Sequence, residues 1–283
     1  MHTKILQILF LFLTSSLFAQ TFIFKGEIGK FESASAFTLT PSGYFFVSDV
    51  GKNEVTKLDT LNKVIQKIGG YGWGDSAFDE PSDIYATDLR VYVTDKNNNR
   101  IQVFDKDLNF LFFIKSNLNA NEIEKFQYPT SCATSIQGDI YILDSENTRI
   151  LKYNSSGNFL LEYGDFRSGD FTLENPIGIA LSQDSKIFVL DNGFLNVFDQ
   201  YGMGLIKINS NFDAVNINIS YNNLTLNSLD SLYYQNLKMP ISKFKNITPK
   251  NLPKGTKIVD SIILNQRLYI LTESKILIFN IIN

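Results

Sequence analysis

The sequence predicts an all-β fold, a six-bladed β-propeller whose blades are four-stranded antiparallel sheets. Three observations predict it. Short apolar segments alternate with period 2, one strand unit recurs along the chain, and aromatic residues are plentiful while Pro is scarce. The alternation is clearest over residues 90–105, where two such segments flank a polar turn at 95–100.

The recurring unit is defined by an Asp at the end of its second strand. Four units align on this Asp, and consecutive members lie about 46–49 residues apart. Two weaker units, 216–236 and 259–280, bring the count to six. Outer strands are expected at 63–68, 110–114 and 159–163. The four strong units are 36–59, 82–105, 130–154 and 177–199, and their Asp residues are Asp49, Asp95, Asp144 and Asp191.

The sixth unit ends too close to the C-terminus to form its own outer strand. Residues 22–28 have the pattern of an outer strand and precede the first unit in the matching phase. We therefore expect residues 21–29 to complete the last blade, which closes the ring and leaves no unpaired edge there.

Two units carry the motif of a known family. The segment Pro81…Val91-Tyr-Val-Thr-Asp95…Asn99-Arg100-Ile-Gln-Val-Phe-Asp105 resembles an NHL repeat, as does Pro129…Ile140-Tyr-Ile-Leu-Asp144…Arg149-Ile. The resemblance covers most of the chain after residue 20 and implies a six-bladed propeller. It implies no single activity, because the family includes protein binders, RNA binders and a few enzymes.

The amino terminus predicts export. Residues 1–19 have the pattern of a secretory signal peptide, with Lys4, an apolar core at 5–13 and the small residue Ala19 at the cleavage point. A membrane anchor is the alternative, but the apolar run is short for a bilayer span. We expect a periplasmic or extracellular protein with no membrane span after cleavage, in which residues 20–283 form one propeller domain.

Charge and cysteine content exclude some functions. The formal net charge of −3 offers no basic surface, so no nucleic acid is expected as a partner. Cys132 is the single cysteine, which excludes an internal disulfide, and we expect a buried thiol there. His2, the single histidine, lies in the predicted signal peptide, which disfavours His-based triads, zinc sites and lyase chemistry.

The repeated Asp is interpreted as a structural device. A ring of catalytic carboxylates is the alternative, but recurrence in every strong unit favours a carboxylate that accepts N–H bonds from the turn that follows. Arg100 and Arg149 share another repeated position and are expected to brace turns or neighbouring blades.

Three polar residues are predicted near the propeller axis. Asp83, Asn216 and Asp260 fall at one position of the innermost strands, where Ala36, Ser131 and Gly178 are the equivalents. Their oxygens could bind Ca²⁺ or Mg²⁺. Calcium-dependent lactonase-type propellers place Glu, Asn and Asp near the axis, but no Glu occupies this position here. No cofactor is the expectation, and a metal-dependent, lactonase-like hydrolase is the alternative.

The connection 69–80 is the predicted binding surface. It is rich in glycine and carries Tyr71 and Trp73, the only tryptophan. Exposed aromatic tips suit recognition of a protein or glycan, whereas buried ones would only anchor the loop, as expected of Phe78, Phe126 and Phe171. The leading hypothesis is an exported, non-enzymatic scaffold that presents this loop face to a protein or glycan. The partner's identity and the oligomeric state stay open.

Overall fold

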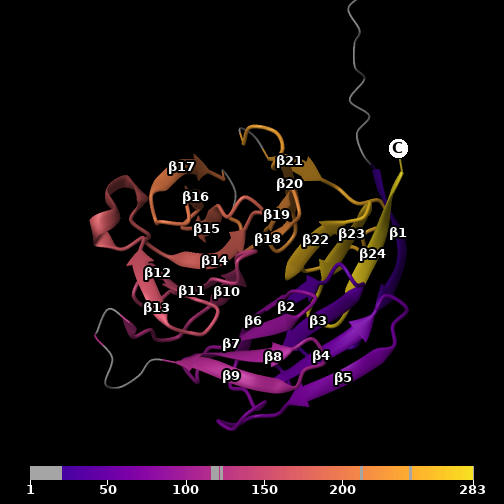
Figure 1. The fold of residues 1–283 in the computed structure, drawn as a ribbon. Helices are drawn as coiled ribbons and strands as arrows, with labels where there is room; N and C mark the ends of the chain where they lie inside the picture. Colours follow the sequence, from indigo (N-terminus) through magenta and orange to yellow (C-terminus); the bar gives the residue numbers. More distant parts are fainter. Residues whose placement is uncertain (1–20, 116–120, 122–123, 211–212, 242–243, 283) are drawn as a thin grey trace, which may run out of the picture.

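The computed structural model describes residues 21–115, 121, 124–210, 213–241 and 244–282. These residues form six four-stranded antiparallel sheets, arranged as blades around a common axis (Figure 1). The predicted fold class, a six-bladed propeller, is confirmed. The expected signal peptide, 1–19, lies outside the described residues.

Within each blade the chain runs from the axis outward, one strand after the next. The strands of the six blades, from inner to outer, are β2 (Ala34–Leu39), β3 (Tyr44–Asp49), β4 (Glu54–Asp59) and β5 (Val64–Gly69); β6 (Pro81–Ala86), β7 (Arg90–Asp95), β8 (Arg100–Asp105) and β9 (Phe110–Lys115); β10 (Ser131–Thr134), β11 (Ile140–Asp144), β12 (Arg149–Tyr153) and β13 (Phe159–Tyr163); β14 (Pro176–Leu181), β15 (Ile187–Asp191), β16 (Phe194–Phe198) and β17 (Gly204–Asn209); β18 (Asn216–Ser220), β19 (Asn223–Asn227), β20 (Leu232–Asn236) and β21 (Lys245–Ile247); and β22 (Asp260–Leu264), β23 (Arg267–Leu271), β24 (Ile276–Ile282) and β1 (Thr21–Ile28).

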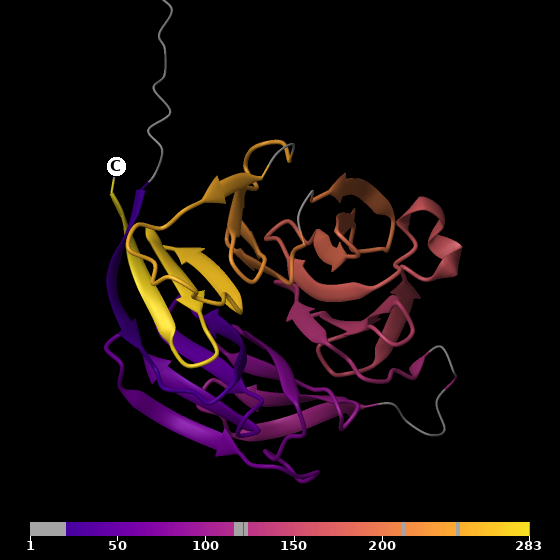
Figure 2. The same cartoon turned by 180° about the vertical axis from the view of Figure 1, so that it is seen from behind.

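The N-terminal strand closes the ring. Strand β1 pairs antiparallel with β24 from Thr21↔Ile282 to Ile28↔Ile276, with one irregularity between Phe24 and Gly26. Figure 2 shows this indigo strand beside the yellow end of the chain. The closure by residues 21–29 is therefore as predicted, and the edge of β24 is paired.

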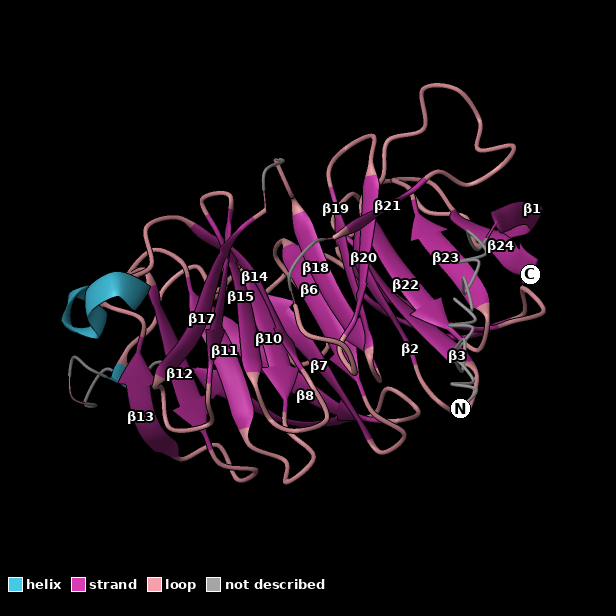
Figure 3. Ribbon diagram, turned by 90° about the horizontal axis from the view of Figure 1, so that it is seen from above, coloured by secondary structure: helices cyan, strands magenta, loops and turns pink. Residues whose placement is uncertain are grey.

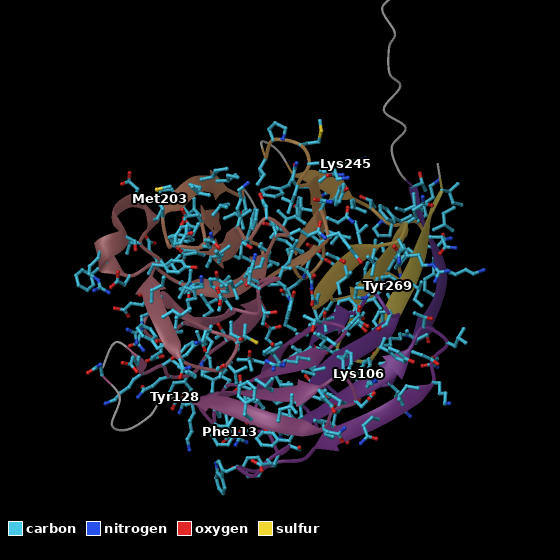
Figure 4. The ribbon with its side chains drawn as sticks, in the orientation of Figure 1. Lys106, Phe113, Tyr128, Met203, Lys245 and Tyr269 are labelled. Carbon is cyan, nitrogen blue, oxygen red and sulfur yellow. The ribbon has the colours of Figure 1, made fainter. Side chains whose placement is uncertain are left out.

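The hydrophobic core lies between neighbouring blades. Middle strands such as β11 are buried on both faces, so their residues are almost all apolar. Outer strands are partly exposed, and β5 is exposed along most of its length. Side chains fill the spaces between the sheets (Figure 4), where the ring of Tyr269 in the last blade lies 5.2 Å from that of Phe45 in the first.

Two faces of the ring carry the loops, along the two edges of the molecule in Figure 3. The inter-blade face carries the connections from one blade to the next, including 69–80, the described residues 124–130 and 164–175. The last of these contains the short 3-10 helix η2 (Phe166–Phe171). The hairpin face carries the turns between first and second strands, including 87–89 and 135–139. Within the described chain, no helix is long and apolar enough to cross a membrane.

The repeated Asp residues fix the inter-blade connections. Asp49 accepts the N–H groups of Glu32 and Ser33 at 2.8 and 2.9 Å, and Asp191 accepts those of Glu174 and Asn175. We expected these bonds to come from the following turn. Most backbone donors instead belong to the connection that enters the blade, because the Asp lies at the end of β3 or β15, next to that connection.

The fifth and sixth blades lack the repeated Asp, since β19 and β23 end with Asn227 and Leu271. Ser228 and Thr272 accept turn N–H groups through their hydroxyls, from Ser231 and Lys275 at 3.1 Å each. These hydroxyls bond the turn that follows, whereas the repeated Asp mostly bonds the connection that enters the blade. The fifth and sixth units therefore lack the residue that marks the repeat in the other four.

Candidate functional site

The connection 69–80 has a fixed backbone. The guanidinium of Arg100 donates to the carbonyls of Trp73, Gly74 and Ala77 at 2.9–3.0 Å. Asn98 donates to the carbonyl of Gly72 at 2.9 Å, and the Gln102 amide donates to that of Ala77 at 2.6 Å. A connection with several glycines, whose backbone could otherwise adopt many conformations, is therefore held in one.

Arg100 is itself held by the repeated Asp. Its Nε donates to Asp95 Oδ2 at 2.7 Å, and both side chains are buried. Asp95 also accepts the N–H of Asp79 at 2.8 Å and side-chain bonds from Asn98 and Gln102. The prediction that Arg100 braces a turn holds for this blade, and the pair is buried rather than solvated.

The two aromatic tips project from this fixed backbone into solvent. Tyr71 is 67% exposed and Trp73 is 72% exposed. Their ring centroids lie 6.0 Å apart with an interplanar angle of 62°, an edge-to-face pair. Both side chains thus meet the exposure condition set for recognition, and their role in binding stays a prediction.

The other large aromatic residues of the inter-blade face divide into anchors and exposed side chains. Phe78 and Phe126 are fully buried, and Phe171 packs on Phe198 at 5.8 Å, so these three anchor their connections as expected. Tyr128 and Phe166 are exposed. Exposed aromatic side chains therefore occur on three successive connections, at 69–80, 124–130 and 164–175.

The axial residues form bridges between blades. Asp83 Oδ2 accepts the Ser131 hydroxyl at 2.7 Å and the Cys132 N–H at 3.0 Å in the next blade. Ser131 Oγ in turn accepts the N–H of Ile179 at 3.2 Å, one blade further on. Asp260 Oδ2 lies 3.4 Å from the N–H of Phe37, across the ring closure. Sequence reasoning placed these residues at the axis but missed their bridging role, since no pattern within one blade reports contacts to the next.

Burial perturbs both axial carboxyls. It raises the pKa of Asp83, against the opposing effect of the hydrogen bonds from Ser131, Cys132 and Ile84. Burial raises the pKa of Asp260 well above its ordinary value, and the nearby Asp83 charge raises it further. Both effects have the same physical origin, because removing a carboxylate from water disfavours its charged form.

All three residues predicted for a metal line the axial cavity, including Asn216. Asn216 uses Oδ1 to accept the N–H of Ile217, and its Nδ2 lies 3.4 Å from the Val259 carbonyl. Over the described ranges, no group of three or more His, Cys, Asp or Glu residues could hold a metal ion. The oxygens of Asp83 and Asp260 are partly used by backbone N–H groups, so Ca²⁺ at this position stays a prediction without a supporting ligand cluster.

The axial channel narrows between two cavities. The larger, about 660 Å³, opens toward the hairpin face, and the smaller, about 270 Å³, toward the inter-blade face. Asp83, Ser131 and Asn216 line both cavities and so mark the narrow part of the channel, whereas Asp260 lines only the larger cavity.

Cys132 is buried in the wall of the larger cavity, and burial raises the pKa of its thiol. A buried, protonated thiol fits the structural role expected for this residue.

Comparisons with known proteins agree with this architecture. The family model described as NHL repeat matches residues 78–104. The chain is 30% identical over 146 residues to Protein brain tumor of Drosophila melanogaster, covering 50% of this chain and 13% of that protein. It is 25% identical over 189 residues to NHL repeat-containing protein 3 of Mus musculus, covering 58% of this chain and 53% of that protein. The matches thus span about half or less of these relatives' lengths.

Among solved structures, a streptogramin B lyase superposes with a TM-score of 0.64 at 14% identity, covering 91% of this chain and 97% of that one. At this identity the likeness shows the fold alone. The repeat match, the NHL-containing relatives and the six blades together define the class of protein. The chain has a six-bladed β-propeller fold that carries an NHL repeat, and it is similar to NHL-repeat proteins.

Proposed function

We propose that this protein is an exported, non-enzymatic binding scaffold whose inter-blade face recognises a protein or glycan through Tyr71 and Trp73. The observation that carries the proposal is the combination of a fixed backbone with two exposed aromatic rings. Three carbonyls of the connection are held by the buried guanidinium of Arg100, while both rings are mostly in solvent.

The physical argument concerns the free energy of binding. Large aromatic side chains contribute much contact area for few rotatable bonds, and a loop already in one conformation loses little entropy on binding. Exposed Tyr128 and Phe166 on the next two connections extend the same kind of surface. NHL propellers commonly mediate protein interactions, which favours a protein over a glycan as the partner.

The test uses Trp73 as its own probe, because it is the only tryptophan. A partner that covers this ring should shift its fluorescence emission to shorter wavelength. Candidate partners come from two sources, a glycan array and cross-linking in the native cell envelope. The double variant Tyr71→Ala, Trp73→Ala lacks this tryptophan, so its binding is measured by calorimetry. It should bind the partner more weakly by more than about 2 kcal/mol and keep a nearly unchanged melting temperature.

Tyr201 provides the matched control, since it is an equally exposed aromatic residue in a turn at the opposite edge of the ring. Tyr201→Ala should bind like the parent. Equal losses of affinity in the two variants, or undiminished binding by the double variant, would show that the recognition surface lies outside 69–80.

Export is tested separately, by the mass and N-terminal sequence of the protein recovered from its native envelope.

The alternative is a metal-dependent hydrolase centred on Asp83, Asn216 and Asp260. The placement of all three on one axial cavity favours it, and the shortage of ligands opposes it. Calorimetry with Ca²⁺ and Mg²⁺ decides between the two. Our proposal expects no tight binding, and micromolar affinity lost in Asp260→Ala would support the hydrolase. A lyase mechanism of the kind named for the structural neighbour would have to do without histidine beyond His2.

A further inference from the structure

The larger axial cavity is separate from the aromatic connection and opens on the opposite, hairpin face. Its volume, about 660 Å³, lies within the range of pockets that bind small organic molecules. Its walls combine apolar and polar side chains and come from the innermost strands of several blades. The apolar part of the wall includes Ile84, Tyr85, Ile179, Leu181, Ile217 and Ile262.

The inner end of this cavity holds two carboxyl groups without a matching cation. Asp83 and Asp260 line it, and within the described part of the chain neither forms an ion pair with Lys or Arg. The cation among the described lining residues is Arg90, whose guanidinium donates to the Ser155 carbonyl at 3.2 Å and lies 5.8 Å from the ring of Phe112. Asp260 is buried and Asp83 is partly buried. Carboxylates removed from water without a cationic partner are costly, so a cation that arrived between them would be favoured.

The two carboxyls keep room for a further hydrogen-bond donor. Asp83 Oδ1 accepts the Ile84 N–H at 2.8 Å, and Asp260 Oδ1 accepts the Ser261 N–H at 2.6 Å. The Asn218 side chain also forms a hydrogen bond with the Asp260 carboxyl, and the four oxygens of the two carboxyls are not saturated by the bonds seen. A carboxylate oxygen can accept two. An ammonium group offers up to three N–H donors, which matches two carboxyl groups. Ca²⁺ usually takes six to eight oxygens, and the described residues contain no group of three or more His, Cys, Asp or Glu that could hold a metal ion.

The geometry points to a binding site for a small organic cation in this cavity: a protonated amine on an apolar body. The ammonium lies between Asp83 and Asp260 at the inner end, and the apolar body packs against the isoleucine-rich wall. The mouth of the cavity also suits the apolar body of such a ligand. The hairpin turns place Leu89 and Ile136 there, with 77% and 73% of their surfaces exposed. A ligand that extends outward would cover these two side chains.

The experiment titrates the full-length mature protein with three probes of one shape and different charge: phenethylamine, phenethyl alcohol and phenylacetate. Calorimetry should show binding of the amine, at least tenfold weaker binding of the alcohol, and none of the acid. Asp83→Asn and Asp260→Asn should each lower the affinity for the amine at least tenfold, while the affinity for the alcohol stays unchanged. Asp88→Asn is the control, since Asp88 lines the mouth but is exposed and bonded to the N–H of Ser42; it should bind the amine like the parent.

Three outcomes would overturn the assignment: no amine binding at millimolar concentration, equal affinity for amine and alcohol, or displacement of the amine by Ca²⁺ at micromolar concentration. If an axial variant fails to fold, as judged by near-ultraviolet circular dichroism, Ile136→Arg replaces it. A fixed positive charge at the exposed mouth should repel the amine and spare the alcohol, and an unchanged preference would equally refute the proposal.

Discussion

The buried pair Asp95–Arg100 allows a quantitative test of how the inter-blade connection is held. Replacing Asp95 by Ala removes the acceptor for the Asp79 N–H and for three side chains, among them the guanidinium of Arg100. Loss of a partner for a buried N–H costs about 1–3 kcal/mol. A buried guanidinium left without its carboxylate costs about 3–5 kcal/mol. We expect Asp95→Ala to lower the free energy of unfolding by about 3–5 kcal/mol.

Asp191→Ala is the matched control within the same chain. Asp191 is equally buried and also accepts the N–H groups of its incoming connection. Phe194 stands where the second blade has Arg100, because Asp191 pairs with Phe194 as Asp95 pairs with Arg100. Asp191→Ala leaves no guanidinium without its carboxylate. It should therefore lower the free energy of unfolding by only about 1–3 kcal/mol.

The assay is urea unfolding followed by circular dichroism, with the free energy of unfolding extrapolated to water. The double variant Asp95→Ala, Arg100→Met should recover part of the stability that Asp95→Ala loses, because it removes the unpaired charge. The reasoning is refuted if Asp95→Ala costs no more than Asp191→Ala, or if the double variant is no more stable than Asp95→Ala.

Three further predictions follow from particular contacts. Deleting residues 21–28 removes buried Phe22 and Ile28 and exposes the edge of β24, so the melting temperature should fall sharply and light scattering should rise; a truncated protein that melts like the parent would contradict ring closure. The raised folded-state pKa of Asp260 means that its contribution to stability is present at low pH and is lost as the pH rises through that pKa. Asp260→Asn should therefore unfold at higher urea than the parent at neutral pH, with the difference vanishing as the pH falls toward the ordinary value of 3.8; a difference independent of pH would contradict this. Cys132 should resist iodoacetamide at neutral pH in the folded protein and react in denaturant, because its buried thiol stays protonated; rapid labelling of the folded protein would disprove its burial.

The sequence by itself determined the fold, because the information was periodic. Each blade repeats the same order of strands, and the Asp at the end of the second strand marks the phase of the repeat in the four strong units. The closure by β1 followed from the same phase, since a last unit without an outer strand requires one from elsewhere. The repeated position of Arg100 and Arg149 also predicted their role as braces. Arg149 donates to Asp144 at 2.9 Å and to the Lys125 carbonyl, much as Arg100 donates to Asp95 and to its own connection.

Only the tertiary structure decided how each axial residue is used and what holds the aromatic connection. Asp83 and Ser131 are bonded to residues 48 or 49 positions away, each in the next blade. Such contacts join equivalent positions of neighbouring blades, so nothing within a single repeat reveals them. The exposure of Trp73 depends likewise on Arg100, whose side chain reaches back 27 residues to the Trp73 carbonyl. Local patterns specify strands and turns, whereas these bonds form only when the blades pack around a common axis.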